Sequence, residues 1–400
     1  MRILILSAST GGGHLRASSA LKTYILNHDS NSTVEIVDTL KYVSPLLNKT
    51  VTEGYEQLAK KSPKVYGAMY KTANIDICKS FLAAFNSLFS KKLIPLLSEF
   101  NPDIIISTHP FATEMVSNLK DTYNITIPLV CIMTDYAPHK AWIGDNVDAY
   151  VVSNDDMVDM MVDIGVNKDI IYPYGIPIED SFHLSNNKDN TLSELGLSEG
   201  KPTILIMAGS FGVTDILKIY NNITKIDIDF QIIVITGRNK KLYEAFEKLL
   251  DNSIETSSTI SKVSKALSEK IAFSSKTQES KPKPTKLIYF TNEVHKYMQV
   301  ADLIITKPGG LTISEALACN LPMAIFNAIP GQEEENAEFL INNNMAVKLE
   351  KGSTCAKTIE NLLSNRKRLK DMKSSCESFD KSASSEYVFA LIKDLIEKKN

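Results

Sequence analysis

The chain has 400 residues, more than a single hydrophobic core usually fills, so two domains are expected. Its apolar fraction of 44% and charged fraction of 23% are typical of a soluble globular protein, and a formal net charge of -3 gives no reason to expect nucleic acid as a partner. Five cysteines without CxxC spacing predict free thiols in a reducing compartment.

Neither a secretory signal nor a membrane-spanning helix is expected. The apolar segment 1–6 runs directly into glycines and is too short for a signal peptide, so it predicts a first strand. No apolar run approaches the roughly 20 residues needed to cross a bilayer. We therefore expect a cytoplasmic protein, bound to a membrane at most at its surface.

Short β-branched runs alternate with helical segments, which predicts α/β architecture with parallel sheets. Expected strands in the first half are 2–8, 34–38, 103–107, 127–133 and 148–153. Those in the second half are 203–208, 231–236, 287–290, 302–306 and 323–326. A Gly/Pro pair at 174–177 marks the boundary, so we predict domains 1–178 and 179–384, with a C-terminal helix 385–400 packing back on the first.

Two segments interrupt this alternation. Residues 252–286 are rich in Ser, Thr and Lys and predict a mobile insertion. Residues 41–98 carry nine lysines against three acidic residues, together with an apolar helical face. This second segment indicates either a packed helix with a solvated lysine face or adsorption to an anionic membrane surface.

A glycine turn with a histidine follows the first strand, in the order Ser9-Thr10-Gly11-Gly12-Gly13-His14. Counted from Gly11, the last glycine of a dinucleotide fingerprint falls on Arg16, so that fingerprint fails. We predict that Gly12 and Gly13 present His14 to a cleft between the domains. An imidazole with a pKa near neutrality is suited to act there as general base on an acceptor hydroxyl. The alternative is a tight turn in which the histidine is incidental.

Polar residues also end the third and fourth strands, at the same carboxyl edge as His14. Asp135 is predicted either to orient His14 or to act as a base itself. His109 and His139 have two possible roles, one functional and one as a helix cap.

The second half carries a candidate nucleotide site. Ser210 lies in a glycine turn that could bind phosphate oxygens, and Arg238 offers a positive charge to a diphosphate unless it is an ordinary surface arginine. The residues after strand 287–290 could recognise a nucleobase through the backbone; they are Asn292, Glu293 and Val294.

The longest motif runs from Lys307 to Glu315, behind a buried strand. A turn followed by a helix places amide N–H groups beside a helix N-terminus, which suits a diphosphate. Gly309 and Gly310 are expected to let the backbone approach a ligand, and a helix is expected over 311–319. The residues assigned to nucleotide binding here are Pro308, Gly309, Gly310, Leu311 and Thr312. Glu315 could bind a ribose diol. Gln332 and Asn336, four residues apart, could contact sugar hydroxyls from one helix face, with Glu333 assigned to the same site.

Taken in order, these motifs resemble the family of monogalactosyldiacylglycerol synthases and processive diacylglycerol glucosyltransferases, relatives of the lipid II N-acetylglucosaminyltransferase. The matching segments are GGGH at 11–14, STHPF at 107–111, TDY-PH-W at 134–142, GRN at 237–239, TKPGGLTISEAL at 306–317 and PGQEEENAEFL at 330–340. The resemblance implies a GT-B fold, in which two Rossmann-like domains with parallel sheets face an interdomain cleft. It also implies His14 as the base, Glu315 as the ribose ligand, and Gln332 with Asn336 as sugar contacts.

The spacing of acidic residues before Glu315 bears on whether the reaction retains or inverts the anomeric configuration. Many retaining GT-B enzymes share a Glu-x7-Glu spacing, but Lys307 stands eight positions before Glu315 here. This favours inversion by single displacement, with UDP leaving toward amide N–H groups and Arg238. The sequence has no metal-ligand cluster, so neither a metal nor a cofactor is expected, and the UDP-sugar is a substrate.

The resemblance implies transfer of glucose or galactose from a UDP-sugar to diacylglycerol or a glycosyl-diacylglycerol, at the cytoplasmic face of an anionic membrane. A transferase with a polyprenyl-linked acceptor is an alternative. A UDP-sugar 2-epimerase shares the architecture, but the GGGH and PGQEEEN segments fit it poorly. A catalytically inactive lipid-binding module would not need His14, Glu315 and Gln332 together.

Overall fold

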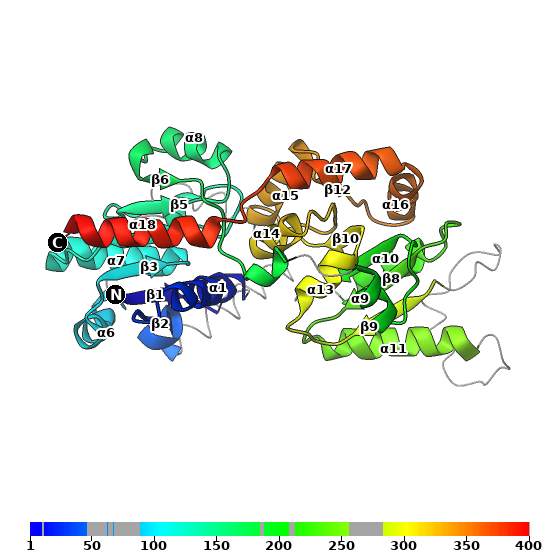
Figure 1. The fold of residues 1–400 in the computed structure, drawn as a ribbon, viewed down its shortest axis with the longest axis horizontal. Coiled ribbons are helices and arrows are strands. Elements are labelled where there is room, and N and C mark those ends of the chain that lie inside the picture. Colours follow the sequence, from blue (N-terminus) through cyan, green and yellow to red (C-terminus); the bar gives the residue numbers. More distant parts are fainter. Residues whose placement is uncertain are drawn as a thin grey trace.

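The computed structural model describes residues 1–9, 12–45, 89–184, 188–207, 213–255 and 283–399, together with positions 62 and 67. Over these ranges the chain forms two six-stranded sheets, each made of parallel strands and covered by helices. The two halves lie side by side and meet at a narrow waist (Figure 1). The predicted α/β class with two parallel sheets is confirmed.

The first sheet has the strand order β2-β1-β3-β4-β5-β6. Its strands are β1 (Arg2–Ser7), β2 (Thr33–Asp38), β3 (Ile104–Ser107), β4 (Leu129–Ile132), β5 (Ala149–Val151) and β6 (Ile171–Tyr172). The central strands are nearly continuous Ile, Leu and Val, because a parallel sheet is buried on both faces. Strand order reverses between β1 and β3, so their carboxyl ends flank the place where such sheets bind ligands.

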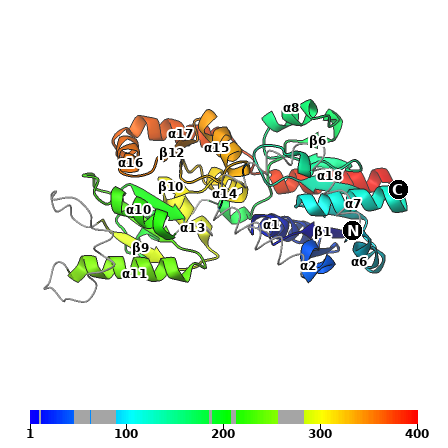
Figure 2. The same cartoon turned by 180° about the vertical axis from the view of Figure 1, so that it is seen from behind.

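Helices cover both faces of this sheet. They are α1 (Gly13–His28), α2 (Thr39–Val43), α6 (Ile94–Phe100), α7 (Pro110–Tyr123) and α8 (Asp156–Asp163), with the C-terminal helix α18 (Ser384–Lys399). On one face, Val388 and Ile392 of α18 pack with Ile3 and Ile5 of β1. Both views place α18 along the first half, far from the rest of the C-terminal sequence (Figures 1 and 2).

The second sheet repeats the design, in the order β12-β11-β10-β7-β8-β9. Its strands are β7 (Thr203–Met207), β8 (Gln231–Ile235), β9 (Thr285–Ile288), β10 (Leu303–Thr306), β11 (Met323–Ile325) and β12 (Ala346–Lys348). The described helices are α9 (Lys188–Glu194), α10 (Val213–Ile223), α11 (Lys240–Glu255), α13 (Val294–Val300), α14 (Gly310–Ala318), α15 (Gln332–Asn342), α16 (Thr354–Ser364) and α17 (Arg366–Ser378). Here the strand order reverses between β7 and β10, which puts the Lys307–Glu315 motif at that reversal.

Two of the predicted segments are only partly covered by the described residues. Most of the basic segment 41–98, and residues 256–282 of the predicted insertion, lie outside them. Within the described part of the chain, no helix combines the length and apolarity needed to cross a membrane.

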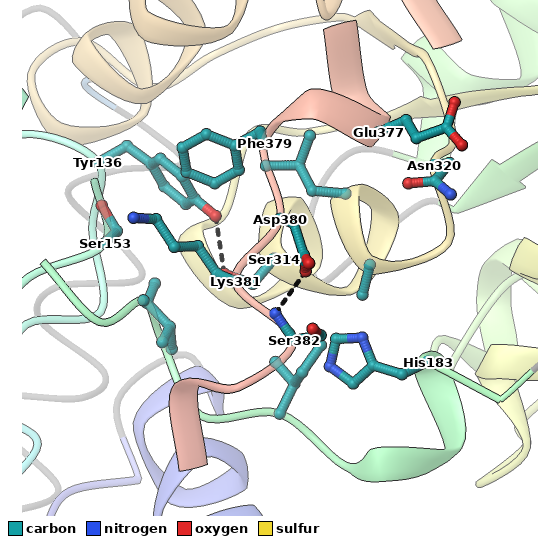
Figure 3. Close-up of a pocket in the computed structure, with 15 residues that line it drawn as sticks. Tyr136, Ser153, His183, Ser314, Asn320, Glu377, Phe379, Asp380, Lys381 and Ser382 are labelled. Carbon is teal, nitrogen blue, oxygen red and sulfur yellow. Dashed lines mark hydrogen bonds between the residues drawn. The ribbon is translucent and has the colours of Figure 1, made fainter. Parts of the chain in front are cut away.

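The chain crosses between the halves twice, near Gly175 and near Lys381. Gly175 adopts a left-handed φ of +90°, and a Cβ atom there would lie 2.7 Å from the Lys381 Cβ, so the crossings pack closely. The Lys381 amine binds the Pro173 carbonyl oxygen at 2.9 Å and an Asp155 carboxylate oxygen at 3.0 Å. A cavity of about 370 Å³ lies beside these crossings, with Tyr136 and Ser314 on its wall (Figure 3).

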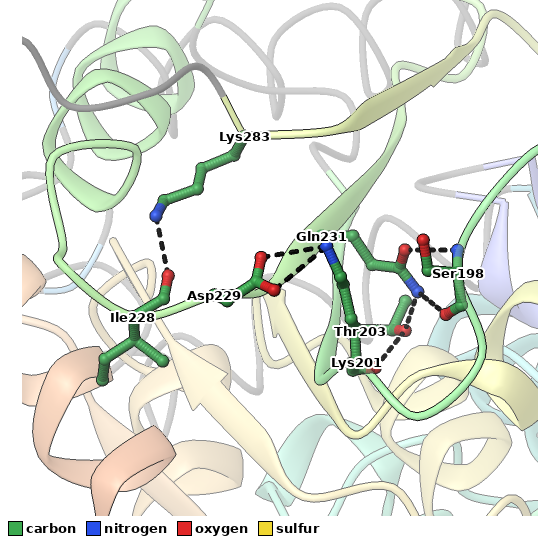
Figure 4. Close-up of polar contacts among 7 residues, drawn as sticks. All are labelled: Ser198, Lys201, Thr203, Ile228, Asp229, Gln231 and Lys283. Carbon is green, nitrogen blue, oxygen red and sulfur yellow. Dashed lines mark hydrogen bonds and ion pairs between the residues drawn. The ribbon is translucent and has the colours of Figure 1, made fainter.

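Gln231 joins the amino-terminal ends of β7 and β8 to the preceding turn (Figure 4). Its fully buried amide accepts a hydrogen bond from the Ser198 amide at 2.8 Å and donates to the Ser198 carbonyl at 2.8 Å and the Thr203 hydroxyl at 3.0 Å. The neighbouring Lys201–Asp229 ion pair is far more exposed.

We expect Gln231→Leu to lower the free energy of unfolding by about 1–3 kcal/mol, because it leaves the two Ser198 backbone groups without their partner. Lys201→Gln is the matched control and should cost at most about 1 kcal/mol, since it removes only a surface ion pair. Chemical denaturation measures both. Equal effects of the two substitutions would contradict a stabilising role for Gln231.

Candidate active site

His14 lies in the first turn of α1, directly behind the carboxyl end of β1. Gly12 precedes this helix with a left-handed φ of +80°, a conformation that glycine adopts without strain. The His14 Nδ1 atom is 2.8 Å from the Thr134 hydroxyl oxygen. The glycine turn therefore brings the imidazole to the residues that follow β4.

Dense packing around His14 changes its acid–base behaviour. Burial lowers the pKa of His14 to about 4, while a hydrogen bond with the Thr108 backbone raises it in part. Burial therefore favours the neutral imidazole at physiological pH, in which one ring nitrogen can accept a proton.

His109 caps the N-terminus of α7, and His139 caps the short 3-10 helix Lys140–Trp142. The Nδ1 atom of His109 accepts a hydrogen bond from the Phe111 amide at 3.3 Å, and that of His139 accepts one from the Ala141 amide at 3.1 Å. The His109 ring also lies edge-on to His14, with 4.8 Å between centroids, and burial lowers its pKa well below the usual value. His109 therefore has the predicted capping role, and its ring also forms one wall of the His14 site.

Asp135 follows Thr134 at the carboxyl end of β4 and is 5% exposed. The Gln332 side-chain amide donates a hydrogen bond to its Oδ1 atom from the other half of the molecule. Burial raises the pKa of Asp135 to about 6, although hydrogen bonds from Gln332, Asn336 and Trp142 favour the carboxylate. Asp135 therefore titrates nearer to physiological pH than an ordinary aspartate.

Tyr136 extends from the same loop into the second half. Its amide donates to the Asn336 Oδ1 atom at 2.7 Å, and its hydroxyl lies 2.8 Å from the Ser314 hydroxyl (Figure 3). Asn336 is almost fully buried, and its Nδ2 atom donates to the Pro308 carbonyl at 3.0 Å. Its amide thus joins the two halves, whereas its contact with a sugar stays a prediction.

At Gly310 the backbones of the two halves approach each other closely. A Cβ atom at this position would lie 1.8 Å from the Thr134 carbonyl oxygen. We predicted that Gly309 and Gly310 let the backbone approach a ligand. At Gly310 the approaching group is the backbone of the first half, whereas Gly309 has open space around its Cβ position.

Glu315 lies in the second turn of α14 and is 2% exposed. Its Oε1 atom accepts a hydrogen bond from the Arg16 guanidinium of α1, while its Oε2 atom is buried and has no hydrogen-bond partner among the residues that the structure describes. Burial raises the pKa of Glu315 to about 7, and Arg16 lowers it in part. The sequence analysis does not identify Arg16 as a site residue, although its place two residues after His14, in the helix that follows the glycine turn, is a usable signal.

Other residues of the Lys307–Glu315 and 330–340 motifs support the same interface. Leu311 packs in one cluster with Ala17 of α1, and Thr312 is partly exposed in the first turn of α14. The Glu333 carboxylate accepts a hydrogen bond from the Ile329 amide at 2.7 Å, and burial raises its pKa.

The remaining predicted donor residues lie at the carboxyl ends of β8 and β9. Arg238 is exposed, and its guanidinium lies 4.7 Å from the centroid of the Phe290 ring. Asn292 and Glu293 are exposed, whereas Val294 is buried at the start of α13. Ser210 lies outside the described residues. In the parts of the chain that are described, no three His, Cys, Asp or Glu side chains are grouped to hold a metal ion.

The arrangement of two doubly wound halves with facing polar motifs is that of GT-B glycosyltransferases. Acinetobacter baumannii MurG superposes with a TM-score of 0.62 at 14% identity, covering 98% of this chain and all of that one. The structure of S. aureus MnaA with UDP gives a TM-score of 0.59 at 12% identity, covering 97% of this chain and 94% of that one. At these identities the likeness establishes the fold.

Sequence comparison goes further. Residues 14–178 match the monogalactosyldiacylglycerol (MGDG) synthase family, and residues 203–387 match the glycosyltransferase family 28 C-terminal domain. A processive diacylglycerol beta-glucosyltransferase of Staphylococcus epidermidis is 31% identical over 93% of this chain and 87% of its own length. The Bacillus pumilus protein of the same description is 26% identical over 100% of this chain and 95% of its own length. The chain therefore belongs to the family of processive diacylglycerol beta-glucosyltransferases and is a sugar-transferring enzyme.

Proposed function

We propose that this enzyme transfers glucose or galactose from a UDP-sugar to the hydroxyl group of diacylglycerol or of a glycosyl-diacylglycerol. The observation that carries the proposal is the convergence of His14 and Asp135 from one half with Glu315 and Gln332 from the other. The names of the relatives support diacylglycerol as the acceptor.

In this proposal the second half binds the donor. The ribose lies at Glu315, whose buried Oε2 atom needs a hydrogen-bond donor, and the diphosphate lies at the N-terminus of α14. Gln332, at the first position of α15, lies next to Asp135 and is placed to contact the sugar between the halves. Arg238 supplies positive charge to the departing UDP.

The first half would then activate the acceptor. His14 takes the proton of the attacking hydroxyl, and Asp135 is the second candidate for this base. The oxygen attacks the anomeric carbon as the bond to UDP breaks, so the reaction inverts configuration in one displacement. The depressed pKa of His14 keeps it in the neutral form that this step needs.

The purified protein, incubated with UDP-glucose or UDP-galactose and diacylglycerol vesicles, tests the proposal. We expect a glycosyl-diacylglycerol in the lipid extract and UDP in the aqueous phase. A polyprenyl-phosphate acceptor serves as the parallel arm. Transfer only to that acceptor, or conversion of a UDP-N-acetylhexosamine to its epimer without transfer, would contradict the assignment.

Access to a lipid acceptor requires contact with a membrane, which we assign to the cytoplasmic surface and to the basic segment 41–98. Each lysine near an anionic surface contributes about 1 kcal/mol, and this attraction weakens with salt. We therefore expect flotation with vesicles containing anionic lipid and progressive release as salt is added. Equal flotation with neutral vesicles would leave apolar insertion as the only explanation.

A further inference from the structure

The Arg16–Glu315 pair joins the two halves directly at the proposed donor site. Arg16 lies on α1, two residues after His14, and its side chain is 49% exposed; Glu315 lies on α14 and is 2% exposed. A buried carboxylate is costly unless it is paired and its oxygens are hydrogen-bonded. Arg16 satisfies Oε1, while Oε2 is buried and finds no hydrogen-bond partner within the described part of the chain.

We propose that Arg16 is a positioning residue through which the acceptor-binding half takes part in donor binding. The guanidinium holds Glu315 by Oε1 and leaves Oε2 to accept a hydrogen bond from a hydroxyl of the donor ribose. This inference rests on the proposed function. It adds that nucleotide-sugar binding and contact between the halves are coupled, because the same carboxylate is shared by the donor and by α1.

The separate roles of the Glu315 Oε1 and Oε2 atoms determine whether removing Arg16 weakens or tightens nucleotide binding. If Arg16 and the nucleotide needed the same oxygen, they would compete, and removing Arg16 would tighten binding. Since the oxygen without a partner is the other one, Arg16 and a ribose hydroxyl can bind together. The positive charge also favours the ionised form of Glu315, and an ionised acceptor forms the stronger hydrogen bond.

Among the described residues, two charged groups shift the pKa of Glu315. Arg16 faces it from α1 and lowers its pKa, whereas Glu179, in the segment that links the halves, raises it. One turn further along α14, the Cys319 thiol has its pKa raised to about 12 and is neutral. Because Arg16 is the cation that favours the carboxylate, its removal should shift the titration of Glu315 to higher pH.

The test is calorimetric titration with UDP-glucose and UDP-galactose, between pH 6 and pH 8.5, of the unmodified protein and five variants. We expect Arg16→Gln to weaken binding about tenfold at pH 7.5, as for loss of one charge-assisted contact, and to move the midpoint of the pH dependence upward. Arg16→Lys keeps the charge and should stay within about threefold of the unmodified protein. Glu315→Gln should remove the pH dependence, and adding Arg16→Gln to it should have little further effect.

Lys201→Gln is the matched control, because it breaks an ion pair at the amino-terminal edge of the second sheet, away from the site. It should leave affinity and pH dependence unchanged. Tighter binding by Arg16→Gln, an unchanged affinity and midpoint, or full additivity with Glu315→Gln would overturn the coupling while leaving the proposed function intact. If the unmodified protein binds neither nucleotide sugar, the proposed function fails and the coupling fails with it.

Discussion

Gly310→Ala is expected to separate the two halves of the enzyme and to reduce sugar transfer by about 5- to 150-fold, the rate equivalent of the roughly 1–3 kcal/mol typical of overpacking. The added methyl group would lie 1.8 Å from the Thr134 carbonyl oxygen. A backbone oxygen at the end of a buried strand cannot move aside as a flexible side chain can. The halves must therefore move apart, which withdraws Gln332 from Asp135 and Arg16 from Glu315.

Gly309→Ala is the matched structural control for this prediction. Gly309 has an ordinary φ of -73° and nothing within 4 Å of its Cβ position. Small-angle scattering and thermal unfolding should distinguish the variants, with a more extended and less stable molecule only for Gly310→Ala. Indistinguishable scattering curves and melting temperatures for the two would show that the contact at Thr134 is dispensable.

His14→Ala should reduce kcat by about 100-fold or more, as expected for loss of a positioned general base. Affinity for the UDP-sugar should change little, because the residues assigned to the donor do not include His14. Steady-state kinetics at saturating donor, with calorimetry for binding, separates the two effects. Near-normal turnover by His14→Ala, together with inactivity of Asp135→Asn, would reassign the base to Asp135.

The pH dependence of kcat provides an independent check on the same choice. Burial lowers the pKa of His14 to about 4 and raises that of Asp135 to about 6. A base must be unprotonated, so activity is lost as pH falls through its pKa. With His14 as the base, kcat at saturating donor should persist well below pH 6. With Asp135 as the base, kcat should decrease as pH falls through about 6, and Asp135→Asn should be inactive at every pH.

Local patterns predicted the elements that position the site. The apolar run 302–306 and the glycines behind it indicated a strand and a helix, and β10 and α14 lie there, with α14 beginning one residue before the expected Leu311. The short edge strands β6 and β12 were missed, because two or three residues carry too little periodicity to be recognised.

Contacts between the halves could not be predicted in this way. Tyr136 and Asn336 are 200 residues apart in sequence, and Arg16 and Glu315 are 299 apart. Periodicity reports which face of an element is buried, but not which distant element covers it. Glycine at position 310 is a further example. The sequence indicates a close approach there, but it does not indicate that Thr134 is the approaching group.

The configuration of the glycolipid product shows directly whether the transfer inverts the anomeric carbon. UDP-glucose and UDP-galactose carry the sugar as the α-anomer, and single displacement by an activated acceptor hydroxyl inverts that centre. Nuclear magnetic resonance of the lipid formed from UDP-glucose or UDP-galactose and diacylglycerol should therefore show a β-linked sugar. An α-linked product would contradict displacement assisted by His14 or Asp135, and the absence of any glycolipid would contradict the proposed acceptor.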